Sequence, residues 1–322
     1  MSETPDEFDW IAALRPLTRG APAALGLLDD AAILPSRPGF DLVVSKDAMV
    51  EGVHFLAGEA ADVVARRLLR TNLSDLAAKA AEPFGYFLMT AWPAARGWSD
   101  REAFIRGLKI DGEGFDLDLL GGDTVATPGP LTVSATVLGW VPSGRAVLRS
   151  GAKAGEALVV LGWVGDGFLG WRAALGEIAD PTGALAAHFR LPEPLLALRG
   201  ALRAGASAAA DVSDGLMADA MHIAQASGLG VSLALDRLPL SPAAAGWLDA
   251  QRDRRAALLR LARGGDDYAL VCAAPDGEAL VSAARAAGVT ASVAGVFTPS
   301  SGLAVTLDGA PVEAGELGWR HA

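Results

Sequence analysis

Hydrophobic and polar residues alternate in several short runs of the chain, and in other segments apolar residues recur at helical spacing. Residues 131–137 (Leu-Thr-Val-Ser-Ala-Thr-Val) alternate as a half-buried strand does. Alternating or short apolar runs predict strands over 41–45, 131–138, 157–161, 230–235, 268–272, 292–296 and 303–307. Helical spacing predicts helices over 60–81, 100–112, 194–204, 216–227 and 277–287. The pattern therefore indicates a mixed α/β (α+β) chain.

Turn-forming residues concentrate between residues 141 and 155, where proline, serine and glycine interrupt the apolar pattern. We place a domain boundary here, which gives an N-terminal domain over 1–145 and a C-terminal α/β domain over 146–322. A chain of 322 residues is long enough for one hydrophobic core to divide into two. The alanine-rich run 201–210 predicts a helix with a packing face of small residues.

The charge balance of the chain is acidic. Asp and Glu number 38 against 27 Lys and Arg, for a net charge of −11. Nucleic acids and anionic membranes attract basic surfaces, so we expect neither as a partner. The longest uncharged stretch, 124–144, contains three prolines that would leave backbone groups unpaired in a bilayer, which favours a strand over a membrane span.

Two further features indicate the compartment. The first seven residues are acidic and lack the basic and apolar regions of a secretory signal. The one cysteine, Cys272, lies in an apolar run, so it is expected to be a small buried strand residue, and no disulfide framework exists. We therefore expect a cytoplasmic protein.

Five short segments carry carboxylate or hydroxyl side chains between apolar runs, where solvated surface residues are not expected. The first holds Asp29 and Asp30: either a carboxylate turns towards a cleft and a metal ion, or Asp29 caps a turn or helix. The second is a strand that leads into Ser45, Asp47 and His54. Ser45 and Asp47 would share one face of that strand and could address one cation, whereas a lone histidine is more often structural.

The third and fourth segments contain Asp75 and Asp123. Asn72 and Asp75 share one face of the helix predicted over 60–81. Because aspartate is a poor helix former, a metal-facing role is favoured for Asp75 over a solvated one. Gly122 and the glycine before it precede Asp123, and glycines let the backbone approach a phosphate closely. A glycine turn capped by the aspartate is the competing interpretation.

The fifth segment is a predicted junction between a strand and a helix, with Asp211, Ser213 and Asp214 two and three residues apart. A helix beginning near Leu216 would add backbone donors and a dipole that favours an anion. A simple N-cap by Asp214 is the competing interpretation.

Each segment is a weak signal alone, but all five offer hard oxygen ligands, and no cysteine or histidine cluster accompanies them. Such ligands favour Mg²⁺ over Zn²⁺. Metal ions held by oxygens suggest phosphoryl transfer, in which the protein mainly positions the reactants. The chain has no Gly-x-x-x-x-Gly-Lys-Ser/Thr loop and no protein-kinase signature, so ATP would be held in another way.

These segments also match a known family, in order and in spacing, over nearly the whole chain. The most specific matches are 47–55, 72–77, 121–124, 149–153, 211–216 and 264–268. On these motifs the chain resembles thiamine-monophosphate kinase, a member of the superfamily that includes aminoimidazole ribonucleotide synthetase and selenophosphate synthetase.

The resemblance implies a fold and an activity. The fold is a two-domain one like that of aminoimidazole ribonucleotide synthetase. Its N-terminal domain would bind ATP and Mg²⁺ and form a homodimer through its sheet, and the dimer would help to form the active-site clefts. The activity is direct, in-line transfer of the γ-phosphoryl group of ATP to the phosphate of thiamine monophosphate, giving thiamine diphosphate in the final step of its biosynthesis. The acceptor phosphate is already ionised at pH 7, so no general base and no phosphoenzyme are expected.

The resemblance also implies roles for individual residues. Several Mg²⁺ ions would be held at Asp30, Ser45, Lys46, Asp47, Asp75, Asp123, Asp211 and Asp214. ATP would contact Gly122, Asp123, Arg149 and Ser213. Thiamine monophosphate would contact His54, Asp266 and Trp319, with Trp319 stacking on an aromatic ring of thiamine.

Four residues depart from the family pattern within these motifs. Lys46 stands where the family usually has threonine. Its ammonium could pair with Asp47 or with phosphate, or it could take the place of a cation. If the family uses only the backbone carbonyl at this position, the change is harmless. Leu28 replaces a glycine and Ala269 replaces a glutamate. Asp266 replaces a glutamate and reaches one methylene less towards substrate. These changes concern the metal site and substrate affinity more than the fold.

Two other functions fit parts of the pattern. The first is an enzyme of the same superfamily with another acceptor, such as a formylglycinamidine ribonucleotide. The sequence contexts of His54 and Trp319, which resemble those of thiamine-binding residues in the family, argue against it. The second is a non-catalytic sensor of thiamine phosphates or nucleotide, in which Lys46 has displaced a catalytic metal ion. A turnover screen over candidate acceptors distinguishes them.

Overall fold

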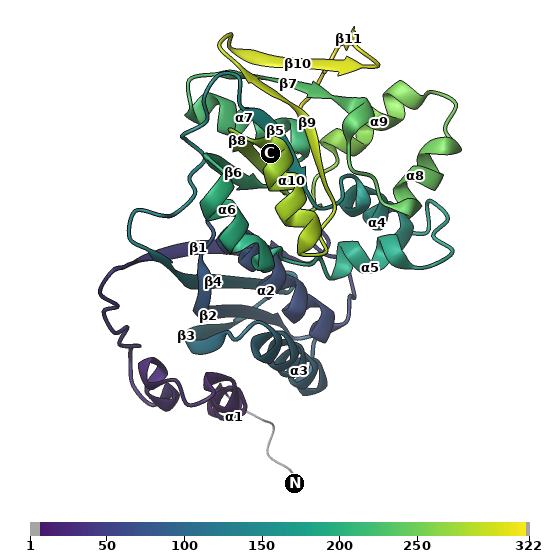
Figure 1. Cartoon of the computed structure of the whole chain (residues 1–322). Coiled ribbons are helices and arrows are strands. Elements are labelled where there is room, and N and C mark those ends of the chain that lie inside the picture. Colours follow the sequence, from purple (N-terminus) through teal and green to yellow (C-terminus); the bar gives the residue numbers. More distant parts are fainter. Residues whose placement is uncertain (1–6, 320–322) are drawn as a thin grey trace. The chain divides into compact units, whose positions relative to one another are not determined.

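The computed structural model describes residues 7–319, and it divides into two compact units, each with its own sheet (Figure 1). The first unit runs through Leu76 and continues from Ala81 to Gly144. The second comprises Ala77–Ala80 and the described residues from Arg145 onwards. Between residues 7 and 319, no helix is both long and apolar enough to cross a membrane.

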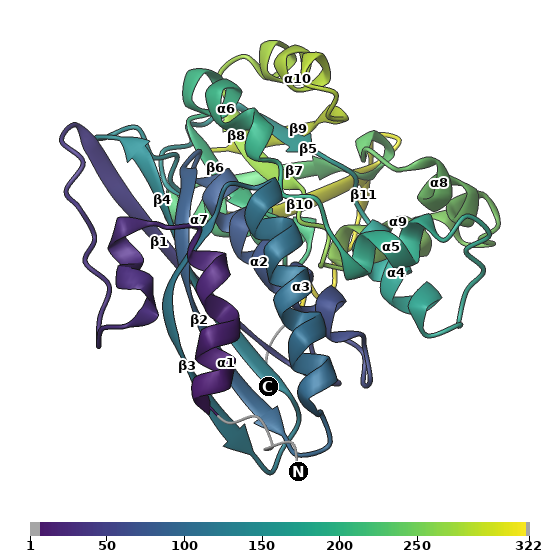
Figure 2. The same ribbon diagram turned by 90° about the horizontal axis from the view of Figure 1, so that it is seen from below.

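The first unit is built on a four-stranded sheet in the order β1-β4-β2-β3. The strands are β1 (Phe40–Val50), β2 (Glu82–Pro93), β3 (Asp118–Thr127) and β4 (Thr132–Pro142). The β2–β3 pair is parallel and the other two pairs are antiparallel. Helices α2 (Ala61–Ala78) and α3 (Trp98–Gly114) cover one face of the sheet (Figure 2). The central strand β4 buries Val133, Ala135 and Val137 completely, as the alternating pattern predicts.

Before the sheet come helix α1 (Glu7–Leu14) and two 3₁₀ turns, η1 (Arg15–Thr18) and η2 (Pro22–Leu27). Trp10 of α1 is almost fully buried and packs edge-on against Trp92 of β2, with ring centroids 5.8 Å apart. Trp92 packs in the same way on Phe104 of α3, at 5.6 Å. These three rings connect the N-terminal helix to the sheet and to α3.

The second unit has a seven-stranded sheet in the order β11-β10-β7-β9-β5-β8-β6. Its strands are β5 (Ala157–Leu161), β6 (Ala208–Asp211), β7 (Gly230–Ala234), β8 (Leu270–Ala274), β9 (Ala291–Thr298), β10 (Gly302–Leu307) and β11 (Ala310–Val312). Its helices are α4 (Asp166–Ala174), α5 (Ala184–Arg190), α6 (Arg199–Gly205), α7 (Leu216–Ala226), α8 (Pro242–Asp249), α9 (Arg254–Arg263) and α10 (Gly277–Ala286), with the 3₁₀ turns η3 (Leu196–Leu198) and η4 (Leu235–Arg237).

Both faces of this sheet are covered, so its central strands are apolar on both sides. Leu158 and Val160 of β5 pack in one cluster with residues of α7 and α9. Val159 and Leu161, which point the other way, pack in a second cluster with residues of α6 and α10. Cys272 of β8 lies fully buried in the second cluster, so the prediction of a small buried strand residue is confirmed, and burial raises the pKa of its thiol to about 12.

The structure corrects two local expectations. The alanine-rich run 201–210 is not one helix: α6 ends at Gly205, and residues 208–211 form the fully buried strand β6 against β8. Burial in the sheet outweighs the intrinsic helix preference of alanine. The two glycines before Asp123 are not a turn, because they lie within the edge strand β3.

Candidate functional site

One group of oxygen ligands lies between strand β1 and helix α2. The Ser45 hydroxyl donates to Oδ2 of Asp75 at 2.5 Å. Two residues along the strand, the Asp47 N–H donates to Oδ1 of Asn72 at 2.9 Å. Nδ2 of Asn72 is held in turn by the Leu68 carbonyl at 2.8 Å, which fixes the amide orientation. The alternation of β1 and the helical spacing of α2 therefore bring Ser45, Asp47 and Asp75 together.

Lys46 lies on the opposite face of β1 from this group. Strand β1 pairs with β4 without a register shift, so Lys46, opposite Thr136, points away from the face that Ser45 shares with Asp47. Of the alternatives left open for Lys46, this orientation disfavours a pairing with the Asp47 side chain. Lys46 instead lines a cavity of about 450 Å³, together with Asp30 and Asp123.

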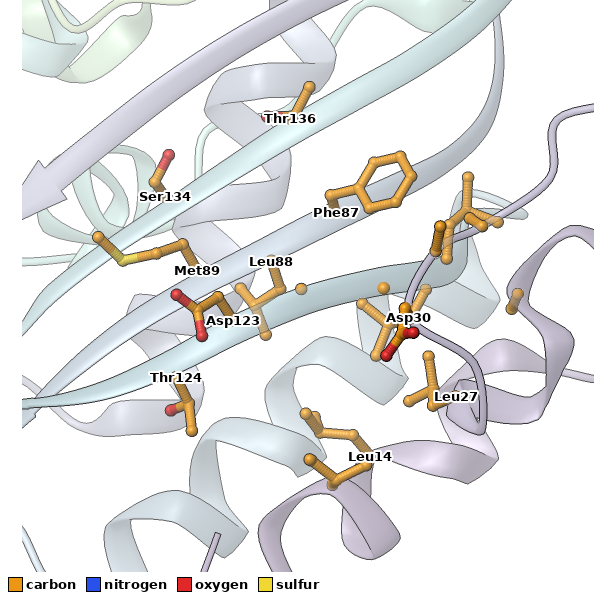
Figure 3. Close-up of a pocket in the computed structure, with 18 of the residues that line it drawn as sticks. Leu14, Leu27, Asp30, Phe87, Leu88, Met89, Asp123, Thr124, Ser134 and Thr136 are labelled. Carbon is orange, nitrogen blue, oxygen red and sulfur yellow. The ribbon is translucent and has the colours of Figure 1, made fainter. Parts of the chain in front are cut away.

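Residues 119–124 of the edge strand β3 form part of the cavity lining (Figure 3). Asp123 and Asp30 lie on different sides of the cavity, with Leu14 and Leu27 forming an apolar wall. Only glycine fits at position 122, because a Cβ there would lie 2.0 Å from the Leu88 carbonyl oxygen of β2. The cavity can therefore take a ligand that is charged at one end and apolar at the other.

His54 lies in a short loop after β1, and the loop is braced from several sides. The Val50 N–H donates to Nδ1 of His54 at 3.1 Å, so the ring proton of the neutral histidine lies on Nε2. Nε of the buried Arg67 donates to the His54 carbonyl at 3.2 Å. The backbone of the loop and the tautomer of His54 are thus both fixed.

Glu51 is the main brace of this loop. It accepts hydrogen bonds from the Arg96 guanidinium at 2.6 Å, from the Gly58 N–H at 2.7 Å and from the Leu131 N–H at 3.3 Å. Burial alone would raise the pKa of Glu51, but these donors and the charge of Arg96 lower it below its usual value. Glu51 therefore stays ionised and keeps the His54 loop attached to the sheet.

The loop Val212–Gly215, between β6 and α7, begins the oxygen cluster of the second unit. Asp211 at the end of β6 is buried, and Asp214 is half-buried. Oδ2 of Asp219, in the first turn of α7, accepts the N–H groups of Asp214 and Gly215, both at 3.2 Å. Asp214, Asp219 and His222 each present a ligand atom, and these atoms lie within 4.8 Å of one another. The predicted strand-to-helix junction with a helix start at Leu216 is confirmed.

Asp211 and Asp214 are the carboxylates of this region that suit a divalent cation. Burial, and then the negative charges of Asp211 and Asp214, raise the pKa of Asp219 well above its usual value. Arg149 opposes that shift only in part, so the carboxylates lack full compensation by protein cations. A hard cation such as Mg²⁺ would supply the missing charge.

Two residues that the sequence predicts as substrate contacts form backbone hydrogen bonds to the same loop. The Asp266 N–H donates to the Ser213 carbonyl and the Trp319 N–H donates to the Asp214 carbonyl, both at 2.9 Å. Asp266 has a left-handed backbone (φ 58°), and its carboxylate accepts the Tyr268 hydroxyl at 3.0 Å. Trp319 is 61% exposed.

The structure thus arranges the sequence-predicted residues in three groups. One group contains Ser45, Asp47 and Asp75, and the cavity with Asp30, Lys46, Gly122 and Asp123 is another. The third group belongs to the second unit and contains Arg149, Asp211, Ser213, Asp214, Asp266 and Trp319. His54, in the loop after β1, lies outside these groups. Sequence reasoning missed Glu51, Asp219, His222 and Tyr268. Asp219 had a usable signal, an aspartate in the first turn of a helix whose start was already predicted.

A fold of this kind, with hard oxygen ligands beside the start of a helix, is found in a known class of proteins. A family model for the N-terminal domain of AIR synthase related proteins matches residues 28–141, and one for the C-terminal domain matches residues 153–308. The chain therefore belongs to the AIR synthase related proteins, and within them to the thiamine-monophosphate kinase family, as the following similarities show.

The chain is 59% identical over 320 residues to the thiamine-monophosphate kinase of Caulobacter vibrioides, covering 98% of this chain and 91% of that protein. It is 36% identical over 306 residues to the thiamine-monophosphate kinase of Escherichia coli, covering 92% and 91%. The crystal structure of thiamine-monophosphate kinase from Stenotrophomonas maltophilia matches with a TM-score of 0.80 at 35% identity, covering 94% and 96%. A structure described as AaThiL complexed with AMPPCP and TMP matches with a TM-score of 0.78 at 26% identity, covering 98% and 97%.

Proposed function

We propose that this chain phosphorylates thiamine monophosphate to thiamine diphosphate, with ATP as the phosphoryl donor. The observation that carries the proposal is the 59% identity to the Caulobacter vibrioides kinase over nearly the full length of the chain. The hydrogen-bonded Ser45–Asp75 pair and the carboxylates of Asp211 and Asp214 supply the oxygen ligands that such a reaction needs. A related enzyme with another acceptor is not favoured.

The proposal assigns Mg²⁺ to Asp30, Ser45, Asp47, Asp75, Asp123, Asp211 and Asp214, with the residue at position 46 contributing its backbone carbonyl. Bound Mg²⁺ would neutralise the charge of the phosphates. The rigid hydrogen bonds of Ser45, Asn72 and Asp75 hold their oxygens ready for it, which lowers the cost of ordering the site.

The proposal assigns ATP to Gly122, Asp123, Arg149 and Ser213, and thiamine monophosphate to His54, Asp266 and Trp319. With Nδ1 accepting from Val50, His54 presents an Nε2–H donor suited to an anionic or carbonyl oxygen. The exposed indole of Trp319 suits stacking on an aromatic ring. No general base is needed, because the acceptor phosphate is already ionised.

We also propose that the protein is a cytoplasmic homodimer. Leu42 and Val44 of the edge strand β1 and Val125 of the edge strand β3 expose large apolar side chains, which favours coverage of this sheet by a second copy. The single cysteine is buried and carries no disulfide, which suits a reducing compartment.

A turnover screen tests the proposed function. The unmodified protein is incubated with ATP, Mg²⁺ and one acceptor at a time: thiamine monophosphate, thiamine or a formylglycinamidine ribonucleotide. We expect thiamine diphosphate and ADP in equal amounts from the first acceptor alone. Binding of thiamine monophosphate without turnover would favour a sensor, and turnover of the ribonucleotide would favour the rival enzyme.

A further inference from the structure

The carbonyl groups of the loop Val212–Gly215 accept hydrogen bonds from two separate segments of the chain. The carbonyl oxygens of three consecutive residues each accept a backbone N–H at 2.9 Å: Val212 from Tyr268, Ser213 from Asp266, and Asp214 from Trp319. The first two bonds extend the antiparallel pairing of β6 with β8 beyond the ends of both strands. The backbone that carries the nucleotide and metal ligands therefore also holds the acceptor contacts.

On its N–H side, the loop is held by the side chain of Asp219. Oδ2 of Asp219 accepts the N–H groups of both Asp214 and Gly215 at 3.2 Å, and Asp219 is only 1% exposed. The Gly215 N–H and the Asp214 carbonyl belong to one planar peptide unit. Its N–H donates to Asp219, and its carbonyl oxygen accepts the N–H of Trp319. Rotation of that unit would break both bonds together.

The surroundings leave the loop no room to move by itself. A Cβ on Gly318 would lie 2.4 Å from the Asp214 carbonyl oxygen, and a Cβ on Gly265 would lie 2.5 Å from that of Ser213. On the opposite side, a Cβ on Gly215 would lie 2.5 Å from the Arg263 carbonyl oxygen. Arg263 also donates to the carbonyl of Ala314 in the segment that leads to Trp319. A displaced loop would therefore displace the acceptor contacts as well.

We propose that Asp219 is a positioning residue for both substrates. By accepting two backbone N–H groups, it sets the loop so that Ser213 and Asp214 meet the metal-bound nucleotide while Asp266 and Trp319 meet the acceptor. This inference rests on the proposed function and adds to it a residue with no assigned role. It requires the hydrogen-bond acceptor of Asp219, and not its negative charge.

Two substitutions separate the acceptor from the charge. In Asp219→Asn the amide oxygen can take the place of Oδ2 and accept the same two N–H groups, whereas Asp219→Leu keeps the branching at Cγ and has no acceptor. We expect the asparagine variant to keep the KM for Mg·ATP and for thiamine monophosphate within about threefold. We expect the leucine variant to raise both KM values about tenfold, the order of magnitude of two lost hydrogen bonds.

Asp276→Ala is the matched control, because Oδ1 of Asp276 accepts the Ala279 N–H at 3.0 Å at the start of α10, which packs in the other apolar cluster. Loss of this bond should leave both KM values unchanged. If Asp219→Asn is impaired as strongly as Asp219→Leu, the charge acts directly and the proposal is overturned. It is also overturned if Asp219→Leu changes the KM of one substrate alone.

If Asp219→Leu does not fold, Gly318→Ala tests the same coupling from the acceptor side. Its Cβ would press on the Asp214 carbonyl oxygen, so the KM for Mg·ATP should rise together with that for thiamine monophosphate. An unchanged KM for Mg·ATP overturns the proposal. Calorimetric binding of Mg·AMPPCP and of thiamine monophosphate gives the same comparison without turnover. An inactive unmodified protein therefore counts against the proposed function, while equal binding by all variants counts against the role of Asp219.

Discussion

At the scale of single residues, the segment Ser45-Lys46-Asp47 shows how strand alternation decides which groups a substituted side chain faces. Threonine is usual at position 46 in the family that the chain resembles, and the lysine lies between two proposed metal ligands. Because β1 is regular here, the lysine side chain points into the cavity with Asp30 and Asp123, away from Ser45 and Asp75. Lys46 therefore lines the same cavity as the Asp30 and Asp123 carboxylates.

Removing this ammonium should change the demand for Mg²⁺ more than the chemical step. We expect Lys46→Thr and the length-matched Lys46→Met to lower the Mg²⁺ concentration at half-maximal rate by about two- to fivefold, because a positive charge no longer competes near Asp30 and Asp123. The maximal rate at saturating Mg²⁺ should stay within about twofold. Rates measured over a Mg²⁺ titration check this, and a large gain in the maximal rate would contradict it.

Glu51 gives a prediction about pH. Its pKa is lowered in the folded protein, so its stabilising contribution is complete above the usual glutamate pKa of about 4.3 and is lost as the pH falls through the lower folded value. Glu51→Gln should therefore reduce the free energy of unfolding by about 1–2 kcal/mol at pH 7. The difference should shrink between about pH 5 and pH 3, as measured by urea denaturation.

The control for this titration is Glu113→Gln, since Glu113 is exposed and lies 3.9 Å from Lys109 on the surface of α3. Its effect should stay within about 0.5 kcal/mol at every pH. A Glu51→Gln difference that is independent of pH would show that the charge of Glu51 does not brace the His54 loop.

At the scale of elements, the sequence correctly predicted the helices and strands whose apolar residues follow one clear helical or strand periodicity. Strand β5 was predicted with its observed bounds, and α7 and α10 to within one residue. Strands β2 and β3 were missed, because the glycines and the polar residues of β3 look like a loop when its partner strand is unknown. Gly122 is required by the approach of Leu88 from β2, 34 positions earlier, and no local pattern contains that contact.

The same contact predicts the effect of a methyl group in β3. In Gly122→Ala the Cβ would meet the Leu88 carbonyl oxygen at 2.0 Å, so the β2–β3 pairing must shift and the free energy of unfolding should fall by about 2–4 kcal/mol. Gly114→Ala is the matched control, because its Cβ would meet nothing within 4 Å at the end of α3. It should be neutral or stabilising by up to about 1 kcal/mol. Denaturant titration of both variants checks the difference.

At the scale of the whole molecule, the sequence predicted most of the candidate site residues but not their grouping. Periodicity placed Ser45 with Asp47 and Asn72 with Asp75, and the structure brings the two pairs together. The bonds from Asp266 and Trp319 to the loop at Ser213 join residues that are far apart in the chain, and spacing carries no information about them. The proximity of Asp266 follows from the pairing of β6 with β8, which depends on the whole sheet, and that of Trp319 from the path of the chain after β11.

The proposed homodimer is tested by sedimentation. We expect twice the mass of one chain, with the sheet of the first unit as the interface. Val44→Glu places a charge on an edge-strand position that is 55% exposed in the single chain, so it should shift the protein towards monomer without unfolding it. Asp276→Glu, a surface change in the second unit, is the control. A monomeric unmodified protein would contradict this assembly.

The most direct measurement for the central claim is the initial rate of thiamine diphosphate formation from ATP, Mg²⁺ and thiamine monophosphate, with three proteins compared. The unmodified protein should turn over, and Asp75→Asn should be slower by about 10²–10³-fold, because it loses a charge at the proposed metal site. Ser74→Ala, the neighbouring control, should retain full activity, since its buried hydroxyl has no hydrogen-bond partner among residues 7–319. No thiamine diphosphate from the unmodified protein at any Mg²⁺ concentration, or equal rates for all three, would contradict the account.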